Sequence, residues 1–197
     1  SNKRKETVSF DSIPDNLKNA YVAIEDQRFY SHGGVDVKRS AAAVFSYVTH
    51  FGSSSFGGST ITQQLVKNMT GSTADTASRK LDEWVKSYML ETFTSKDEIL
   101  NMYLNIIYVG PNVYGVGTGA KYYFNKPVTD LTLEECAFLA GINIAPNSFN
   151  PFTEKNNSEK IAKRTRIVLN KMKELNYISQ EELDAAIASV NTGLKFE

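Results

Sequence analysis

The chain reads GGSTITQQLVKN from residue 57 to residue 68, and this stretch decides how the rest is interpreted. Glycines lead into hydroxyl side chains that suit a helix start, and Thr60 and Gln63 have the spacing of a capping box. Lys67 falls on the same face of the predicted helix as Thr60. Backbone N–H groups at a helix start bind anions, so the stretch suits a phosphate or pyrophosphate; the alternative is an ordinary capped helix with a surface lysine. It is not a Walker loop, because the Gly-Lys-Ser/Thr core is missing.

Helical periodicity extends on both sides of this stretch. The spacing of apolar and capping residues predicts further helices over residues 14–30, 78–93, 96–108, 133–141, 158–175 and 179–190. In the helix over 78–93, Leu81, Trp84, Val85 and Tyr88 form an apolar stripe. Residues 110–119 carry four glycines and one proline and predict a turn-rich loop, and strand signals are few. The sequence therefore predicts a mainly α-helical fold.

Length and composition limit the classes of protein to consider. The 197 residues suit a single domain, and 41% of them are hydrophobic, enough for a normal core. Lysines plus arginines and aspartates plus glutamates number 22 each, which argues against a nucleic-acid partner. The one cysteine, Cys136, lies in an apolar run and is expected to be buried, and a lone cysteine excludes a disulfide framework. No apolar run reaches the roughly 18–20 residues that span a bilayer.

A second stretch with the residues for catalysis covers residues 25–36. Glu25 lies one helical turn from Tyr21 and from Phe29, so its carboxylate is expected to be partly desolvated. Desolvation raises the pKa of a carboxyl group and suits it to general base catalysis near neutral pH. Composition alone favours a solvated Glu-Asp pair near a helix end, with His32 as a polar cap.

Three further stretches carry charged or polar side chains. Arg79 and Glu83 lie four residues apart on the predicted face opposite the apolar stripe, where a solvated ion pair is the expected arrangement. Tyr103 and Asn105 lie in an otherwise apolar helix and are expected to be satisfied interior polar groups. The basic run around Arg164 either faces solvent or contacts phosphate or an anionic lipid surface.

Each stretch alone is weak, but their order and spacing resemble the peptidoglycan glycosyltransferases, which include the N-terminal domains of bifunctional penicillin-binding proteins and the monofunctional transglycosylases. The family's first block, E-D-x-x-F-x-x-H-x-G, matches residues 25–34, and its second, G-x-S-T-x-x-Q-Q-x-x-K-N, matches residues 57–68. The third, R-K-x-x-E, matches residues 79–83, and the fourth, K-x-x-I-L-x-x-Y-L-N, matches residues 96–105. The fifth, R-x-x-x-V-L, matches residues 164–169.

The resemblance implies a lysozyme-like helical lobe plus a small membrane-proximal hydrophobic lobe, in one domain over residues 1–197. A mobile membrane-proximal segment is expected at about residues 38–58. The implied reaction joins lipid II to a growing lipid-linked glycan strand: the GlcNAc 4-hydroxyl of lipid II attacks the anomeric carbon of the strand. Undecaprenyl pyrophosphate leaves, and the anomeric centre inverts to give a β-1,4 bond.

The same resemblance implies the setting of the enzyme. It places the protein at the extracytoplasmic face of the bacterial cytoplasmic membrane, with an N-terminal anchor outside this sequence and a transpeptidase domain after it. The chain opens on Ser1 and not on methionine, so we expect the natural protein to extend beyond both ends.

Residue by residue, the resemblance also implies roles. Glu25 corresponds to the catalytic base, and Glu83 to a second acidic residue near the donor pyrophosphate that helps hold a divalent cation, Mg²⁺ or Mn²⁺. The donor and pyrophosphate side is expected to comprise Ser59, Thr60, Gln63, Gln64, Lys67, Asn68, Arg79 and Arg28. The expected supporting residues are Asp26, Phe29, His32, Lys80, Tyr103, Asn105 and Arg164.

The chain departs from the family pattern at two places. Residues 40–58 offer only His50 where the family commonly has a basic residue, and residues 117–119 are Gly-Thr-Gly where glutamate is common.

Two other functions stay open. A hydrolase acting on finished cell wall would suit the fold, but it usually needs two carboxylates flanking the bond. A non-catalytic module that binds the lipid carrier or the cell wall is disfavoured because Glu25 and Glu83 are both intact.

Overall fold

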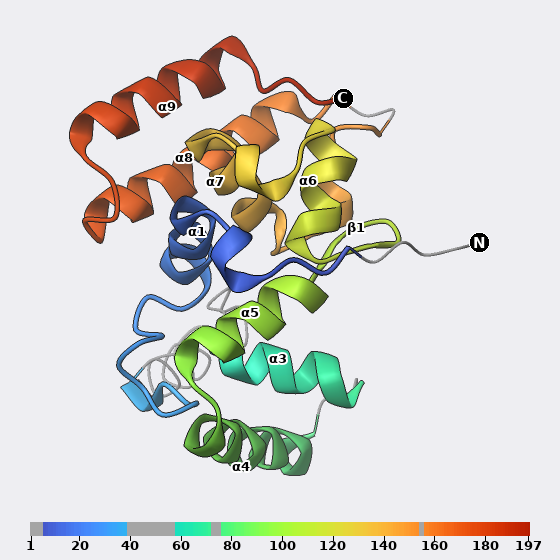
Figure 1. The fold of residues 1–197 in the computed structure, drawn as a ribbon, viewed down its shortest axis with the longest axis vertical. Helices are drawn as coiled ribbons and strands as arrows, with labels where there is room; N and C mark the ends of the chain where they lie inside the picture. Colours follow the sequence, from blue (N-terminus) through green and yellow to red (C-terminus); the bar gives the residue numbers. More distant parts are fainter. Residues whose placement is uncertain (1–5, 39–57, 72–75, 154–155) are drawn as a thin grey trace, which may run out of the picture. The chain divides into compact units, whose positions relative to one another are not determined.

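The computed structural model describes residues 6–38, 58–71, 76–153 and 156–197 (Figure 1). The chain divides into two compact units: Ser1–Gln27 with Leu104–Glu197, and Arg28–Tyr103. The predicted mobile segment at about residues 38–58 lies, apart from its ends, outside the described residues. The prediction of a mainly α-helical fold is confirmed.

The first unit is built around one buried helix. α7 (Leu133–Ile142) is buried from Glu135 to its end, and it packs on α1 (Asp15–Glu25), α8 (Ser158–Glu174) and α9 (Gln180–Thr192). Cys136 lies in this helix with no exposed surface, as predicted, and burial raises the pKa of its thiol. Short 3-10 turns complete the unit: η1 (Phe10–Ser12), η2 (Val128–Asp130) and η3 (Pro146–Phe149).

Helix starts agree closely with the sequence because capping is a local interaction. In α3 (Ile61–Thr70), Thr60 and Gln63 form the predicted reciprocal capping box, and equivalent boxes open α7 and α9. α1 is shorter than predicted. It ends at Glu25 because Asp26 leaves helical geometry at φ −156°, and turns follow over residues 27–35.

Residues 108–124 fold differently from the prediction. A hairpin of β1 (Tyr108–Gly110) and β2 (Val113–Tyr114) is followed by α6 (Val116–Phe124), and these elements include residues 110–119, where a turn-rich loop was expected. Glycines disfavour a helix, which hid α6 in the sequence. Close packing explains them: a Cβ on Gly117 would lie 2.7 Å from Val8 Cγ1, and one on Gly119 would lie 3.1 Å from Val109 Cγ2.

The second unit contains α3, α4 (Ala77–Phe93) and the start of α5 (Lys96–Ile106), which ends in the first unit. α3 packs on α4. The Ser95–Glu98 pair opens α5 with reciprocal hydrogen bonds. The backbone N–H and then the hydroxyl of Ser95, which both donate to Glu98 Oε2, lower the pKa of this exposed carboxyl. Ile99, Leu100 and Tyr103 of α5 have no exposed surface, so the core role predicted for this helix is confirmed.

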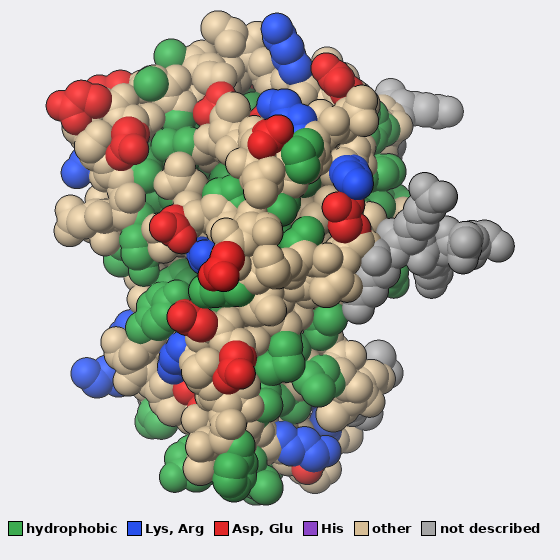
Figure 2. Space-filling model, in the orientation of Figure 1, with side chains coloured by type: hydrophobic (Ala, Val, Ile, Leu, Met, Phe, Trp, Pro, Cys, Tyr) green, Lys and Arg blue, Asp and Glu red, His purple; other side chains and the backbone are tan. Residues whose placement is uncertain are grey.

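The two faces of α4 lie the other way round from what a solvated ion pair on the charged face implies. Leu81, Val85 and Tyr88 are 64%, 55% and 65% exposed, whereas Glu83 on the charged face is 5% exposed. Periodicity separates the two faces of a helix but does not tell which one is inside. We define the α4 stripe as the exposed apolar residues Leu81, Val85, Tyr88, Met89 and Phe93; Figure 2 shows hydrophobic side chains gathered over this helix.

Candidate functional site

The predicted base, Glu25, is the last residue of α1 and is half-buried. One turn earlier, Tyr21 has no exposed surface and donates its hydroxyl to the Leu139 carbonyl at 3.1 Å. Burial, and next the charge of Glu25, raise the pKa of Tyr21 well above its usual value. Asp26 is fully buried, so Glu25 is the member of the Glu-Asp pair that a substrate can reach. This burial contradicts the solvated pair that composition alone favours.

Arg164 of α8 interacts electrostatically with Glu25. Its Nε donates to the Gly141 carbonyl at 2.9 Å. Burial lowers the pKa of the guanidinium, and the Glu25 carboxylate acts in the opposite direction. Arg164 therefore supplies a positive field beside the predicted base while being held by the C-terminal end of α7.

Arg28 forms a bidentate ion pair with Asp36. Its Nε and Nη2 donate to the two Asp36 oxygens, the first at 2.8 Å, and the Asp36 side chain is 6% exposed. Arg28 was predicted to neutralise pyrophosphate. Because a carboxylate already balances its charge, the structure gives this arginine a direct part in holding the loop of residues 28–36.

The start of α3 holds several of the predicted donor residues. Thr60 donates its hydroxyl to the Gly34 carbonyl at 2.7 Å and accepts from the Gln63 N–H at 3.0 Å. Gln63 is 1% exposed, and its Nε2 has no hydrogen-bond partner. Gln64 accepts from the Tyr103 hydroxyl at 3.0 Å. A buried donor without a partner costs free energy, so Gln63 is a candidate hydrogen-bond donor to a ligand at this helix start, and its predicted binding role stays a prediction.

Lys67 and Asn68 lie further along α3 and are exposed. Within the described residues, neither side chain forms a hydrogen bond or an ion pair. An exposed lysine on this helix can reach an anion without first breaking an ion pair. Its predicted role in binding pyrophosphate fits this position and stays a prediction.

A cluster of charges joins α4 to Ser59, two residues before the start of α3. Glu83 accepts from Arg79 Nη1 at 3.1 Å and from Lys80 Nζ, and Lys80 also donates to Ser59 Oγ at 3.0 Å. The Glu83 side chain is 5% exposed and that of Arg79 is 15% exposed. The expectation of a solvated ion pair is therefore wrong. The structure brings Ser59, Arg79, Lys80 and Glu83 together as one cationic group with a single buried carboxylate.

The predicted metal ligand does not fit a metal cage built by the protein. Over the described residues, no three His, Cys, Asp or Glu side chains gather into a group that could hold a metal ion. Both oxygens of Glu83 accept from cationic side chains. A carboxylate engaged in this way would have to exchange these partners to bind Mg²⁺, an ion that usually takes one or two carboxylates together with substrate phosphates.

Most of the expected supporting residues form hydrogen bonds with backbone groups or are buried. Asn105 pairs with both backbone groups of Val8, accepting at 2.9 Å and donating at 3.0 Å, as expected for a satisfied interior amide. The His32 side chain is 6% exposed, and its Nδ1 accepts from the Gly34 N–H at 3.1 Å. Phe29 has no exposed surface. Sequence motifs did not mark Glu91, which lies 3.7 Å from His32 Nδ1.

Gly34 is needed for the approach of this loop to α4. Its φ is +95°, and a Cβ there would lie 2.6 Å from the Ser87 carbonyl oxygen. We expect Gly34→Ala to lower the free energy of unfolding by about 1–3 kcal/mol through backbone strain. Urea unfolding measures this. Gly33→Ala is the matched control, because no atom of the described residues, its chain neighbours apart, lies within 4 Å of its added Cβ; equal losses in both variants would show that the close approach of Gly34 is not the cause.

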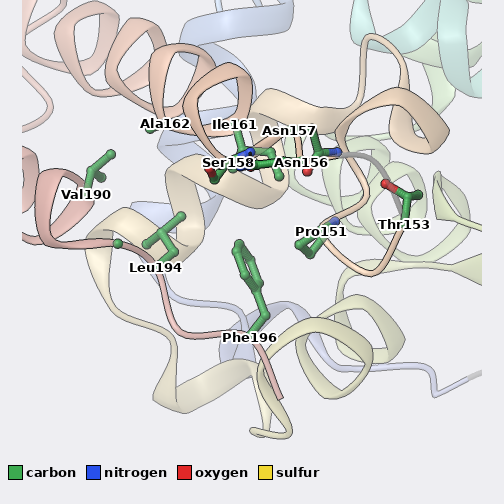
Figure 3. Close-up of a pocket in the computed structure, with 11 residues that line it drawn as sticks. Pro151, Thr153, Asn156, Asn157, Ser158, Ile161, Ala162, Val190, Leu194 and Phe196 are labelled. Atoms are coloured by element: carbon green, nitrogen blue, oxygen red, sulfur yellow. Dashed lines mark hydrogen bonds between the residues drawn. The ribbon is translucent and has the colours of Figure 1, made fainter.

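A pocket lies elsewhere in the first unit, at the start of α8 (Figure 3). Its volume is about 350 Å³, and Phe196 reaches into it from the C-terminal segment. The ring of Phe196 also packs on Phe124 and Phe138, with ring centroids 5.4 and 5.0 Å apart. None of the predicted site residues lines this pocket, so it takes no part in the predicted chemistry.

Comparison with known proteins gives a consistent result. A family model described as Transglycosylase matches residues 1–173. Penicillin-binding protein 1A of Clostridium tetani is 44% identical over 188 residues, which are 93% of this chain and 24% of that protein. Penicillin-binding protein 1A of Clostridium perfringens is 44% identical over 200 residues, which are 98% of this chain and 30% of that protein.

A solved structure agrees with these relatives. The crystal structure of penicillin-binding protein 1A from Haemophilus influenzae matches with a TM-score of 0.58 at 25% identity, covering 100% of this chain and 20% of that chain. The chain thus spans less than a third of the length of these relatives. The family model covers most of the chain, and the motifs at residues 25–34 and 57–68 lie within it; the chain therefore belongs to the transglycosylase family.

Proposed function

We propose that the chain is a peptidoglycan glycosyltransferase domain that polymerises lipid II into β-1,4-linked glycan and releases undecaprenyl pyrophosphate. The observation that supports this most is that its two predicted catalytic acids, Glu25 and Glu83, have different surroundings. Glu25 is a half-buried carboxylate near Arg164, whereas Glu83 is buried among cations. One accessible carboxylate and one separate cationic group suit a reaction that needs a base for the nucleophile and positive charge for an anionic leaving group.

In the proposed reaction, Glu25 takes the proton of the acceptor 4-hydroxyl as that oxygen bonds to the anomeric carbon of the donor. The bond from this carbon to the pyrophosphate oxygen breaks, and its electron pair leaves on the pyrophosphate. Lys67, Arg79 and Lys80, with the donor groups of Ser59 and Gln63, would stabilise the leaving charge. A diphosphate needs no proton in order to leave, so the reaction needs no second catalytic carboxylate.

A glycan hydrolase remains the alternative function. It usually relies on two carboxyl groups flanking the bond, one of them protonated. Within the described residues, both oxygens of the second predicted acid, Glu83, accept hydrogen bonds from Arg79 and Lys80, so neither oxygen is placed to protonate a leaving sugar.

Product analysis with two substrates separates these functions. The chain is incubated with purified lipid II in detergent and, separately, with finished glycan strands. We expect polymer from lipid II and no shortening of the strands. Shortened strands with no polymer from lipid II would replace the transferase by the hydrolase.

We propose that a divalent cation binds with the pyrophosphate substrate and not in a site built by the protein alone. Chelation of Mg²⁺ and Mn²⁺ is then expected to reduce polymerisation, and either ion added back is expected to restore it. Thermal unfolding without substrate should be unchanged by the chelator, since the described residues contain no group of three or more His, Cys, Asp or Glu side chains that could hold an ion. Full polymerisation in the chelator would refute a role for the cation.

The α4 stripe supports a membrane surface as a partner of this domain. None of the helices in the described part of the chain is both long and apolar enough to cross a bilayer. An exposed row of large apolar residues on one helix instead suits shallow insertion at a lipid surface. We further propose that the complete protein is anchored at the extracytoplasmic face of the cytoplasmic membrane and continues into a transpeptidase domain.

Binding to lipid vesicles measures the contribution of the α4 stripe. Leu81→Asn and Val85→Asn are each expected to weaken partitioning by about tenfold, because burying one aliphatic side chain contributes roughly 1.5–3 kcal/mol. Ile144→Asn is the matched control, since Ile144 is 64% exposed but lies outside α4. Equal partitioning by all three variants and the wild type would rule out the stripe as a lipid contact.

A further inference from the structure

A buried carboxylate that no motif marks joins three helices of the second unit. Glu91 lies in the last turn of α4, and its side chain is 7% exposed. Its Oε1 accepts from Thr62 Oγ1 at 2.6 Å, and its Oε2 lies 2.6 Å from Lys96 Nζ. Glu91 therefore links the first turn of α3, the end of α4 and the first residue of α5.

Lys96 extends this linkage to the loop of residues 28–36. Its Nζ also donates to the His32 carbonyl at 2.7 Å. The His32 ring accepts from the Gly34 N–H, and the Gly34 carbonyl accepts from Thr60. The loop is thus tied to α3 twice, once directly through Thr60 and once through Lys96 and Glu91.

The contacts of Glu91 hold Thr62 and Lys96 in place, because losing either partner would leave an oxygen of a buried carboxylate without a hydrogen-bond donor. A carboxylate with 7% exposure has little water to replace a lost partner, so it holds its hydroxyl and ammonium donors closely. Thr62 is fully buried and lies one residue before Gln63. A shift of Thr62 would therefore carry with it the side of α3 that presents Gln63, Gln64 and Lys67.

We propose that Glu91 is a positioning residue for the donor substrate. Through Thr62 it fixes the first turn of α3 against the loop of residues 28–36, so that the donor groups and cations of α3 meet the pyrophosphate in one fixed arrangement. This proposal rests on the transferase function proposed above. It assigns Glu91 no contact with the reacting atoms.

Kinetics with separate donor and acceptor test the proposal. The donor is a lipid-linked tetrasaccharide, and the acceptor is lipid II. Thr62→Val and Glu91→Gln are expected to lower kcat/KM for the donor by roughly 10–100-fold, the scale of a misplacement of about 1 Å, mainly by raising the donor KM. The acceptor KM should stay within about twofold of the wild type. Loss of stability alone would reduce the active fraction and leave both KM values unchanged.

Two further variants separate positioning from general damage. Thr62→Ser keeps the hydroxyl that donates to Glu91 and is expected to restore the donor KM to within about twofold. Thr92 follows Glu91 in α4, and its hydroxyl donates to the Tyr88 carbonyl. Thr92→Val removes this hydroxyl and should leave both KM values unchanged. A donor KM unchanged in folded Thr62→Val, or equally raised in Thr62→Ser, overturns the proposal.

Amide hydrogen exchange tests the same linkage without substrate. Residues 61–65 are expected to exchange at least about tenfold faster in Thr62→Val than in the wild type, while the amides of α7 keep their protection. Unchanged exchange in α3 would contradict the linkage itself. A wild-type chain that transfers no sugar yet shows the expected exchange would instead contradict the proposed function.

Discussion

Replacing Glu25 by glutamine is expected to abolish most of the glycan polymerisation. The amide cannot take the proton of the acceptor hydroxyl, and general base catalysis contributes roughly 10²–10⁴-fold to such reactions. The fold should be retained, because Glu25 is half-buried at the end of α1 and glutamine has nearly the same shape. Initial rates of polymer formation from lipid II, compared at equal concentrations of folded protein, measure the effect.

Glu159→Gln is the control for this substitution. Glu159 is a carboxylate of the same unit with an 82% exposed side chain, paired on the surface with Arg166. Its replacement should leave the rate within about twofold of the wild type, since exposed ion pairs contribute little. If Glu25→Gln polymerised lipid II as fast as this control, Glu25 would not be the base.

Glu83→Gln is expected to reduce both activity and stability. The substitution leaves Arg79 and Lys80 without the carboxylate that they share, and hydrogen bonds to charged groups contribute about 1.5–3 kcal/mol to stability. The two cations would also repel each other and lose the geometry needed to meet the pyrophosphate. We therefore expect a rate at least about 100-fold lower, a scale that a misplacement of about 1 Å can produce.

Asp82, the residue before Glu83, supplies the matched control. Asp82 pairs with Lys86 on the exposed face of α4, with side chains 58% and 47% exposed. Asp82→Asn removes a carboxylate one residue away and should change the free energy of unfolding by less than about 1 kcal/mol. Urea unfolding and polymerisation rates of the two variants give the comparison. Equal effects would mean that the buried cluster has no special role.

The sequence predicted best the features that neighbouring residues decide. The capping boxes that open α3, α7 and α9 each depend on residues three apart, and all three are present. The family was also predicted correctly, because its motifs extend over residues 57–68 without a gap. The burial of Cys136 followed from the apolar residues around it.

Features that depend on tertiary contacts were not predicted. Glu83 is buried where α4 packs on α3, and Lys80 beside it reaches Ser59, 21 residues away in sequence; periodicity carries no information on such contacts. Glu91 meets Thr62 across 29 residues, and no spacing rule connects them. α6 was missed because its glycines, which lower helix propensity, allow close contact with Val8 and Val109.

The stoichiometry of the reaction tests the transferase proposal most directly. The wild-type chain is given lipid II in isotopically labelled water, and the undecaprenyl pyrophosphate released is counted against the β-1,4 bonds formed. Glycosyl transfer by this domain predicts one pyrophosphate carrier released for each new bond, with no label in the sugar that loses the carrier. Label entering the reducing-end sugar without bond formation would show that water is the acceptor, and would contradict glycosyl transfer.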